Sequence, residues 1–76
     1  MIVAYNADEV IDMYLPRLRD LREDSDLTQR QVAEILGIDQ RVYSTYETGK
    51  RDLPLQHLIT LADFYHVTTD YLLGRA

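Results

Sequence analysis

The spacing of apolar residues along the chain predicts helices rather than strands. Apolar side chains recur at intervals of three and four residues in three stretches, namely Leu18 and Leu21; Val32, Ala33 and Leu36; and Leu58, Leu61, Ala62 and Tyr65. This period places each set on one face of a helix, from which the side chains can pack into a common core. No strand is required anywhere in the sequence. We therefore expect an all-α fold.

A repeated capping pattern marks where four of the helices begin. Each pattern consists of an apolar residue followed by a polar capping residue. The capping side chain can accept hydrogen bonds from the free backbone N–H groups of the first turn, and the apolar side chain can pack onto the first helical turns. These capping residues are Asn6, Thr28, Asp39 and Thr68. Thr28 and Gln31 also have the spacing of a capping box. Two prolines, Pro16 and Pro54, indicate further helix starts, because a first turn tolerates a missing N–H group.

The predicted helix ends agree with these starts. Gly37 and Gly49 follow the helices that begin near Thr28 and Asp39, and glycine adopts the left-handed conformation that often terminates a helix. His66 stands at the corresponding place after Tyr65, and histidine is one of the other residues found in that conformation. We therefore assign His66 a structural role.

Two of the predicted helices are joined too closely to lie antiparallel. Gln29–Leu36 and Gln40–Thr48 are separated only by residues 37–39, so the second helix must cross the first at a steep angle. Ala33 is small enough to let the second helix approach. Together with the two capping signals and the Gly49-Lys50-Arg51 ending, this arrangement predicts a helix-turn-helix.

The chain resembles the Xre/Cro-type helix-turn-helix family of phage repressors and bacterial regulators. The similar segments are LTQRQVAEILGI, YSTYETGKRDLP and LITLADFYHVTTDYLLG, and the likeness extends roughly from Leu15 to Gly74. It implies a compact five-helix, lambda-repressor-like DNA-binding domain over residues 16–76. It also implies that helix Gln40–Thr48 enters the major groove of DNA.

The resemblance also implies individual roles on DNA. The base-facing positions are Gln40, Arg41, Ser44 and Thr45, and the backbone-binding positions are Gln29, Lys50 and Arg51. The base-facing side chains share the helix face opposite Tyr43 and Tyr46, and glutamine, arginine and threonine can each read base edges. Lysine and arginine in the following loop can contact phosphates. Without the flanking pattern, the same polar side chains would be read as a solvated helix face.

Composition limits the chain to one small domain with a core of its own. It has 76 residues, of which 46% are hydrophobic and none is cysteine, so neither a disulfide nor a thiolate metal site is available. His57 and His66 have no second ligand at helical spacing. We expect no metal, no cofactor and no enzymatic activity. The start of the chain has no secretion signal, and nothing approaches the roughly 20 apolar residues that span a bilayer, so we expect a soluble cytoplasmic protein.

The net charge of −5 opposes DNA binding at long range, but its distribution is uneven. Between Leu15 and Arg51 seven basic residues balance seven acidic residues, so the excess of negative charge lies outside that segment. We expect Arg17, Arg19 and Arg22 to pair with Asp20, Glu23 and Asp24 around their own helix. The acidic balance keeps a second interpretation open, a protein-interaction module of the antitoxin or antirepressor type.

The first fifteen residues are an extension of the family pattern. Asn6 predicts an extra short helix there, and Val10, Met13 and Tyr14 form an apolar stripe that requires a partner surface. That surface is either the flank of this domain or a second subunit.

We expect the chain to be a sequence-specific transcriptional regulator that represses rather than activates transcription. We also expect a homodimer, formed through the extension or the last helix, on a palindromic operator.

Overall fold

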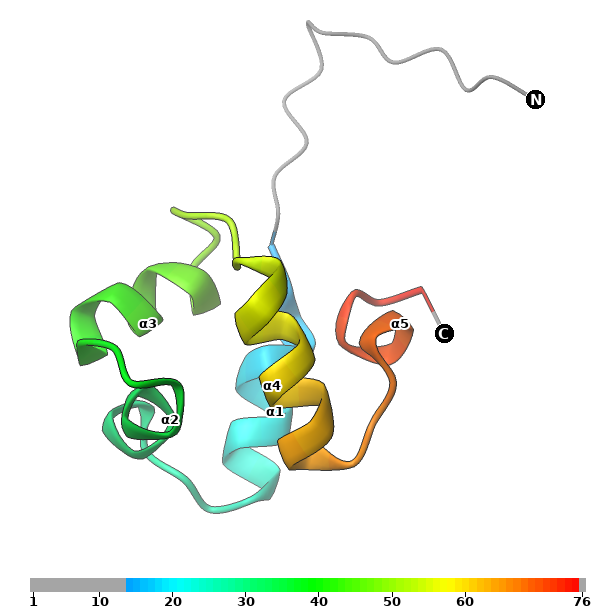
Figure 1. The fold of residues 1–76 in the computed structure, drawn as a ribbon, viewed down its shortest axis with the longest axis horizontal. Coiled ribbons are helices and arrows are strands. Elements are labelled where there is room, and N and C mark those ends of the chain that lie inside the picture. Colours follow the sequence, from blue (N-terminus) through cyan, green and yellow to red (C-terminus); the bar gives the residue numbers. More distant parts are fainter. Residues whose placement is uncertain (1–13, 76) are drawn as a thin grey trace, which may run out of the picture.

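The computed structural model describes residues 14–75 and contains five helices in that range (Figure 1). They are α1 (Pro16–Asp24), α2 (Gln29–Leu36), α3 (Gln40–Glu47), α4 (Leu55–Tyr65) and α5 (Thr69–Leu72). No strand occurs among the described residues, so the expected all-α fold is confirmed. The predicted helix at Asn6 and the apolar positions Val10 and Met13 lie outside the described residues.

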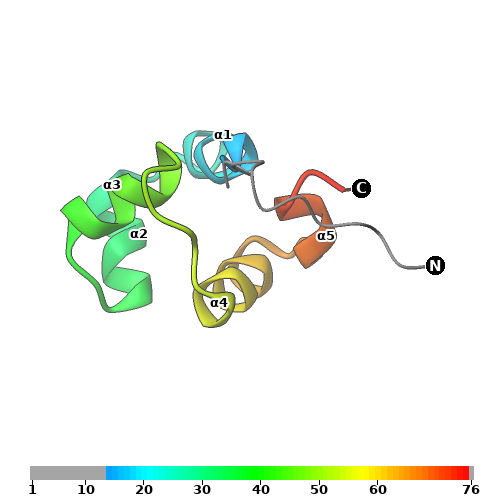
Figure 2. The same ribbon diagram turned by 90° about the horizontal axis from the view of Figure 1, so that it is seen from above.

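The five helices surround a single core. Figure 1 shows α2 and α3 at one end of the molecule, α4 in front of α1 in the middle, and α5 at the other end. The view from above in Figure 2 places α1 and α4 on opposite sides of the molecule. Each helix contributes one side chain with 0% exposure, and these are Leu18, Val32, Tyr43, Leu61 and Leu72. The apolar spacing in the sequence therefore identified the inward face of each helix.

Side chains cap three of the helices as predicted. The Thr28 hydroxyl accepts a hydrogen bond from the Gln31 N–H at 3.1 Å, and the Gln31 side chain accepts one from the Thr28 N–H at 2.8 Å. Asp39 and Thr68 accept from backbone N–H groups at the starts of α3 and α5. Leu27, Ile38 and Val67, the residues before these caps, pack against the core. The caps therefore fix both the helix starts and the entry of the chain into each helix.

The helix ends also match the prediction, with one shift. Gly37 and His66 both adopt the left-handed conformation, with φ angles of 69° and 57°. The helix predicted over Gln40–Thr48 ends one residue earlier, since Thr48 is the cap that follows Glu47. The reversal of the chain is completed at Gly49, where φ is 77°.

Two of the three arginines in α1 do not pair as predicted. Arg19 contacts Glu23 at 2.7 Å, one helical turn away, as expected. Arg17 instead donates to the Tyr71 carbonyl at 2.7 Å and lies 4.1 Å from the centroid of that ring, linking α1 to α5. Arg22 pairs with Glu47 of α3 at 2.7 Å. The spacing along one helix suggested local partners, whereas the packing of α3 and α5 on α1 supplies partners from other helices.

Candidate nucleic-acid interface

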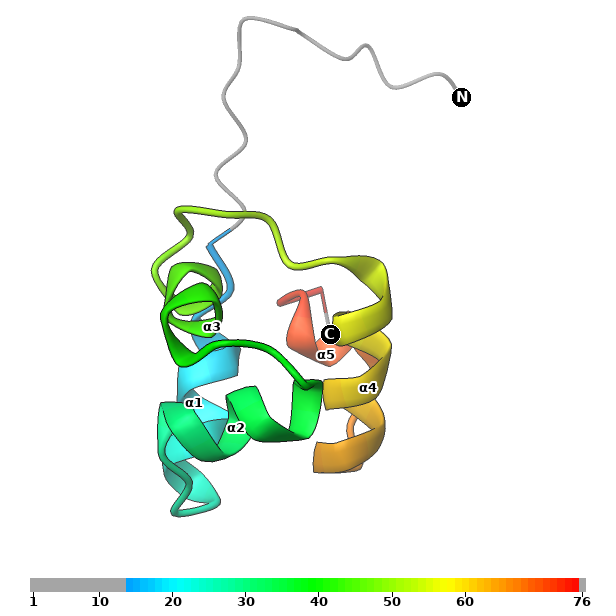
Figure 3. The ribbon, with the colours of Figure 1, turned by 60° about the vertical axis from the view of Figure 1, so that its left-hand side comes forward.

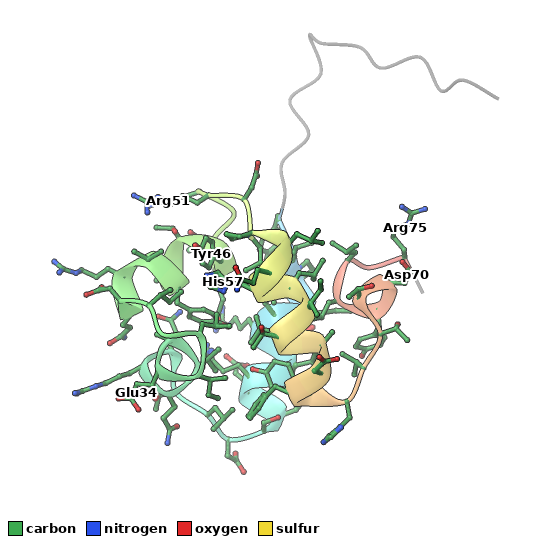
Figure 4. The ribbon with its side chains drawn as sticks, in the orientation of Figure 1. Glu34, Tyr46, Arg51, His57, Asp70 and Arg75 are labelled. Atoms are coloured by element: carbon green, nitrogen blue, oxygen red, sulfur yellow. The ribbon has the colours of Figure 1, made fainter. Side chains whose placement is uncertain are left out.

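Helix α3 has a buried face and an exposed face. Tyr43 and Tyr46 point into the core with 0% and 7% exposure, and the Tyr46 ring lies 6.2 Å from the ring of His57 on α4 (Figure 4). Gln40 and Arg41 are exposed on the first turn. The tyrosines hold α3 against the bundle and leave Gln40 and Arg41 on its outer face. Figure 3 shows how α3 crosses α2 at the short turn that joins them.

Ser44 and Thr45 lie one turn further along α3 and are only partly exposed. The Thr45 hydroxyl donates to the Val42 carbonyl, and the Thr48 hydroxyl donates to the Ser44 carbonyl at 3.2 Å. The free chain thus uses the Thr45 hydroxyl within its own helix. The structure places the four predicted base-facing residues on one helix, with Gln40 and Arg41 the most accessible of them.

Asp39 and Arg41 form a local pair at the start of α3. One carboxylate oxygen, Oδ1 of Asp39, accepts from the Arg41 backbone N–H at 2.7 Å and from the Arg41 Nε at 3.3 Å. The backbone hydrogen bond, followed by the bond from the side chain, lowers the pKa of the Asp39 carboxyl. Both side chains are exposed, at 55% for Asp39 and 92% for Arg41. The capping residue therefore also contacts the side chain of a predicted base reader.

The loop after α3 carries the two predicted backbone-binding cations. Lys50 and Arg51 are exposed, and the Arg51 N–H donates to the Thr45 carbonyl at 3.2 Å, which ties the loop to the end of α3. Figure 4 shows the Arg51 side chain projecting from this loop on the α3 side of the molecule. A Cβ atom at Gly49 would lie 3.4 Å from the Cα of Tyr14, which is an ordinary van der Waals contact, so the positive φ of 77° is what favours glycine in this loop.

Gln29 is the first residue of α2 and lies beside the end of α3. Its side-chain Nε2 donates to Oε1 of Glu47 at 3.2 Å. The amide that was expected to bind a phosphate is therefore held by a carboxylate in the free chain. This hydrogen bond places Gln29 beside the end of α3, and its contact with a phosphate stays a prediction.

Glu47 is the residue at this site that sequence reasoning missed. Its side chain is 4% exposed and accepts from Arg22 Nε at 2.7 Å and from Arg22 Nη2 at 3.1 Å, in addition to Gln29. Arg22 also donates to the Leu27 carbonyl at 3.0 Å. The signal in the sequence was its position one turn after Tyr43, on the inward face of α3. This cluster joins α1, α2 and α3 at a single carboxylate.

The ionisation of Glu47 is set by two opposing effects. Burial disfavours its charged form, but the hydrogen bonds that it accepts outweigh the burial and hold its pKa below the ordinary value. Burial and the neighbouring Glu47 charge raise the pKa of Tyr43 and raise that of Tyr65 to about 12. Glu47 is therefore ionised, and both tyrosines are neutral, at neutral pH.

Within residues 14–75 we find no helix with the length and apolar character needed to cross a membrane.

The short turn at Gly37 and the outward α3 face are found in a known family. The family model described as Helix-turn-helix matches residues 18–72, which include all five helices except the first two residues of α1. This chain belongs to the Xre-like helix-turn-helix family. The resemblance inferred from the capping pattern and the short turn is thus confirmed.

Relatives of this helix-turn-helix chain are named as regulators. The uncharacterized HTH-type transcriptional regulator YobD of Bacillus subtilis is 45% identical over 62 residues, covering 82% of this chain and 55% of YobD. The cryptic phage CTXphi transcriptional repressor RstR of Vibrio cholerae is 38% identical over 55 residues, covering 72% of this chain and 50% of RstR. The chain therefore spans about half the length of these curated relatives.

A solved structure has the same fold. The crystal structure of a transcriptional regulator from Listeria innocua matches with a TM-score of 0.73 and 30% sequence identity. The match covers 78% of this chain and 55% of that chain. The helix-turn-helix arrangement described here is accordingly shared with a protein identified as a regulator.

Proposed function

We propose that this chain binds DNA sequence-specifically through α3 and represses transcription by occupying a promoter. The observation that carries the proposal is the division of α3 into a face buried by Tyr43 and Tyr46 and an outer face that exposes Gln40 and Arg41. A helix held in this way can enter the major groove with its first turn toward the bases. The regulator names of the relatives support this function.

The charges of the free chain are compatible with a local DNA-binding surface. Glu47 is one of the seven acidic residues between Leu15 and Arg51, but it is buried and neutralised by Arg22. Its charge therefore repels a phosphate less than a solvent-exposed carboxylate would. Lys50 and Arg51 remain exposed beside α3. These cations would bind phosphates and set the position of the domain, while Gln40 and Arg41 would read bases.

Selection of binding sites from random DNA, followed by salt titrations, tests the proposal. Replacing Lys50 or Arg51 by alanine should weaken binding to selected and random DNA alike. Each lost phosphate contact should also reduce the slope of log K against log salt by about 0.9. Replacing Gln40 or Arg41 should instead lower the preference for the selected site, by about 1–3 kcal/mol for a good bidentate contact.

A matched control is available at the far end of the molecule. Arg75 lies beyond α5, at the opposite end from α3, so Arg75→Ala removes a positive charge without touching the proposed interface (Figure 4). This variant should leave the salt slope unchanged. Equal losses of affinity for selected and random DNA in all of the α3 and loop variants would contradict the assignment of base readers. A wild-type chain that selects no DNA would contradict the proposed function itself.

We further propose that the chain acts as a homodimer on a palindromic site. A two-fold dimer would present two α3 helices about 34 Å apart, which is one turn of DNA. Of the two predicted contact surfaces, the extension lies largely outside the described residues. The other surface is α5, where Leu72 is buried in the core and Tyr71 is 39% exposed. Sedimentation showing only monomer at high micromolar concentration, with and without the selected DNA, would contradict the dimer.

A second candidate function rests on the net charge of −5. An antitoxin or antirepressor could retain the fold and bind a protein instead of DNA, and an acidic surface would favour a basic partner. The same selection experiment separates the two functions. Enrichment of a DNA sequence that depends on Gln40 and Arg41 would exclude the purely protein-binding alternative.

A further inference from the structure

The first turn of α3 contains a contact that the role of a helix cap does not require. Asp39 caps the helix through the Arg41 backbone N–H, and the same oxygen also accepts from the Arg41 side chain at Nε. Within the described part of the chain, the two terminal Nη groups of Arg41 have no hydrogen-bond partner. The guanidinium is thus bound to Asp39 through Nε, and its two terminal Nη groups can donate hydrogen bonds to another molecule.

This geometry selects which edge of Arg41 can meet a base. Arginine reads guanine through two parallel N–H donors directed at the O6 and N7 acceptors. Because Nε is engaged by Asp39, the pair of terminal Nη groups is the edge left for such a contact. In water an ion pair as exposed as this one has little effect on stability. Its effect on orientation grows when DNA displaces water from around the pair, since the interaction then acts in a lower dielectric.

We propose that Asp39 is a positioning residue that orients Arg41 for bidentate recognition of guanine by the terminal Nη groups. The inference rests on the proposed DNA-binding function and adds a specificity-determining residue to it. Asp39 carries a negative charge, so it weakens attraction to every phosphate nearby. Asp39 is therefore expected to increase the preference for guanine over other bases and to lower the affinity for DNA of any sequence.

Replacement of Asp39 by serine tests this role with little effect on the cap. Serine caps helices about as well as aspartate, but it is neutral and too short to reach the guanidinium. The base position read by Arg41 is first identified as the one whose preference Arg41→Ala reduces most. Binding of wild type, Asp39→Ser, Arg41→Ala and the double variant is then measured on the selected site, on that site with the base changed, and on random DNA. Thermal unfolding of each variant confirms that it is folded.

We expect Asp39→Ser to reduce the guanine preference at that position about three- to tenfold, a part of the roughly 5- to 150-fold discrimination of a good bidentate contact. The same variant should bind random DNA more tightly than wild type. In the Arg41→Ala background, Asp39→Ser should leave the remaining base preference unchanged. Asp39→Asn keeps the cap and an acceptor oxygen without the charge, so it should retain more of the preference than serine does.

Glu34→Gln is the matched control for loss of a carboxylate charge. Glu34 lies in the same surface hollow as Asp39 and Arg41 but pairs with Arg30 at 3.7 Å. Its removal should raise general affinity and leave the guanine preference intact.

An equal loss of preference after Asp39→Ser with and without Arg41 would overturn the proposal, and would indicate that Asp39 contacts a base directly. An unchanged preference in both backgrounds would also overturn it, while leaving the proposed DNA binding intact. A wild type that selects no site would refute both.

Discussion

Replacement of Glu47 by glutamine should destabilise the domain strongly, although it changes only one side-chain atom. The carboxylate accepts three hydrogen bonds, at 2.7 and 3.1 Å from Arg22 and at 3.2 Å from Gln29. Glutamine would present an NH2 group to at least one of these donors and leave the Arg22 charge without its partner. Breaking one side of a buried ion pair costs about 3–5 kcal/mol. Arg22 is 13% exposed and keeps the Leu27 carbonyl, so we expect the lower end, about 3 kcal/mol.

Thermal and urea unfolding at neutral pH measure this loss. For a domain of this size, about 3 kcal/mol corresponds to a fall in Tm of roughly 12–24 °C. Glu34→Gln makes the same chemical change at an exposed ion pair and should cost less than about 0.5 kcal/mol. Adding Arg22→Met to Glu47→Gln removes the unpaired charge and should restore at least about 1 kcal/mol. A loss for Glu47→Gln no larger than that of the control, or no recovery in the double variant, would refute the reasoning.

Four further predictions concern the ionisation of Glu47, two helix ends and the core. The folded state lowers the pKa of Glu47 below its ordinary value, so its stabilisation is complete above that ordinary pKa and is lost as the pH falls through the folded value. The difference in unfolding free energy between wild type and Glu47→Gln should therefore shrink in acid, and a constant difference would contradict the assignment. Gly37→Ala should cost about 1 kcal/mol because its φ is positive, whereas His66→Gly should stabilise by up to about 1 kcal/mol; urea midpoints decide both signs. Leu61→Ala should cost about 2–5 kcal/mol in the same assay because this side chain has 0% exposure, and a loss under 1 kcal/mol would show that the core does not depend on it.

The sequence predicted most of the fold because the signals involved are local. A cap such as Thr28 and a stop such as Gly37 act within a few residues, and the apolar spacing of α4 depends only on its own turn. The same holds for the first turn of α3, where Gln40 and Arg41 are exposed as expected. Each of these features could be predicted without knowing how the helices pack.

The missed contacts that join different helices connect residues that are distant in the chain. Arg22 and Glu47 are separated by 25 positions, and Arg17 and Tyr71 by 54. Arginine and glutamate on helices are ordinarily solvent-exposed, so composition favoured local pairing for Arg22 and gave no reason to expect a buried Glu47. Only the approach of α1 to α3 brings these charges together. The hydrogen bond that Gln29 makes in the free chain depends on the same approach.

The meeting of three helices at the Glu47 carboxylate also limits how this domain can be divided or recombined. A segment that carried only α2 and α3 into another helical scaffold would bring Glu47 without Arg22, and the host would receive a buried acid with no cation beside it. A successful graft would need an arginine on the host helix that takes the place of α1. The α2–α3 half of the fold is therefore not independent of the rest, because the partner of its buried carboxylate lies on α1, outside the motif.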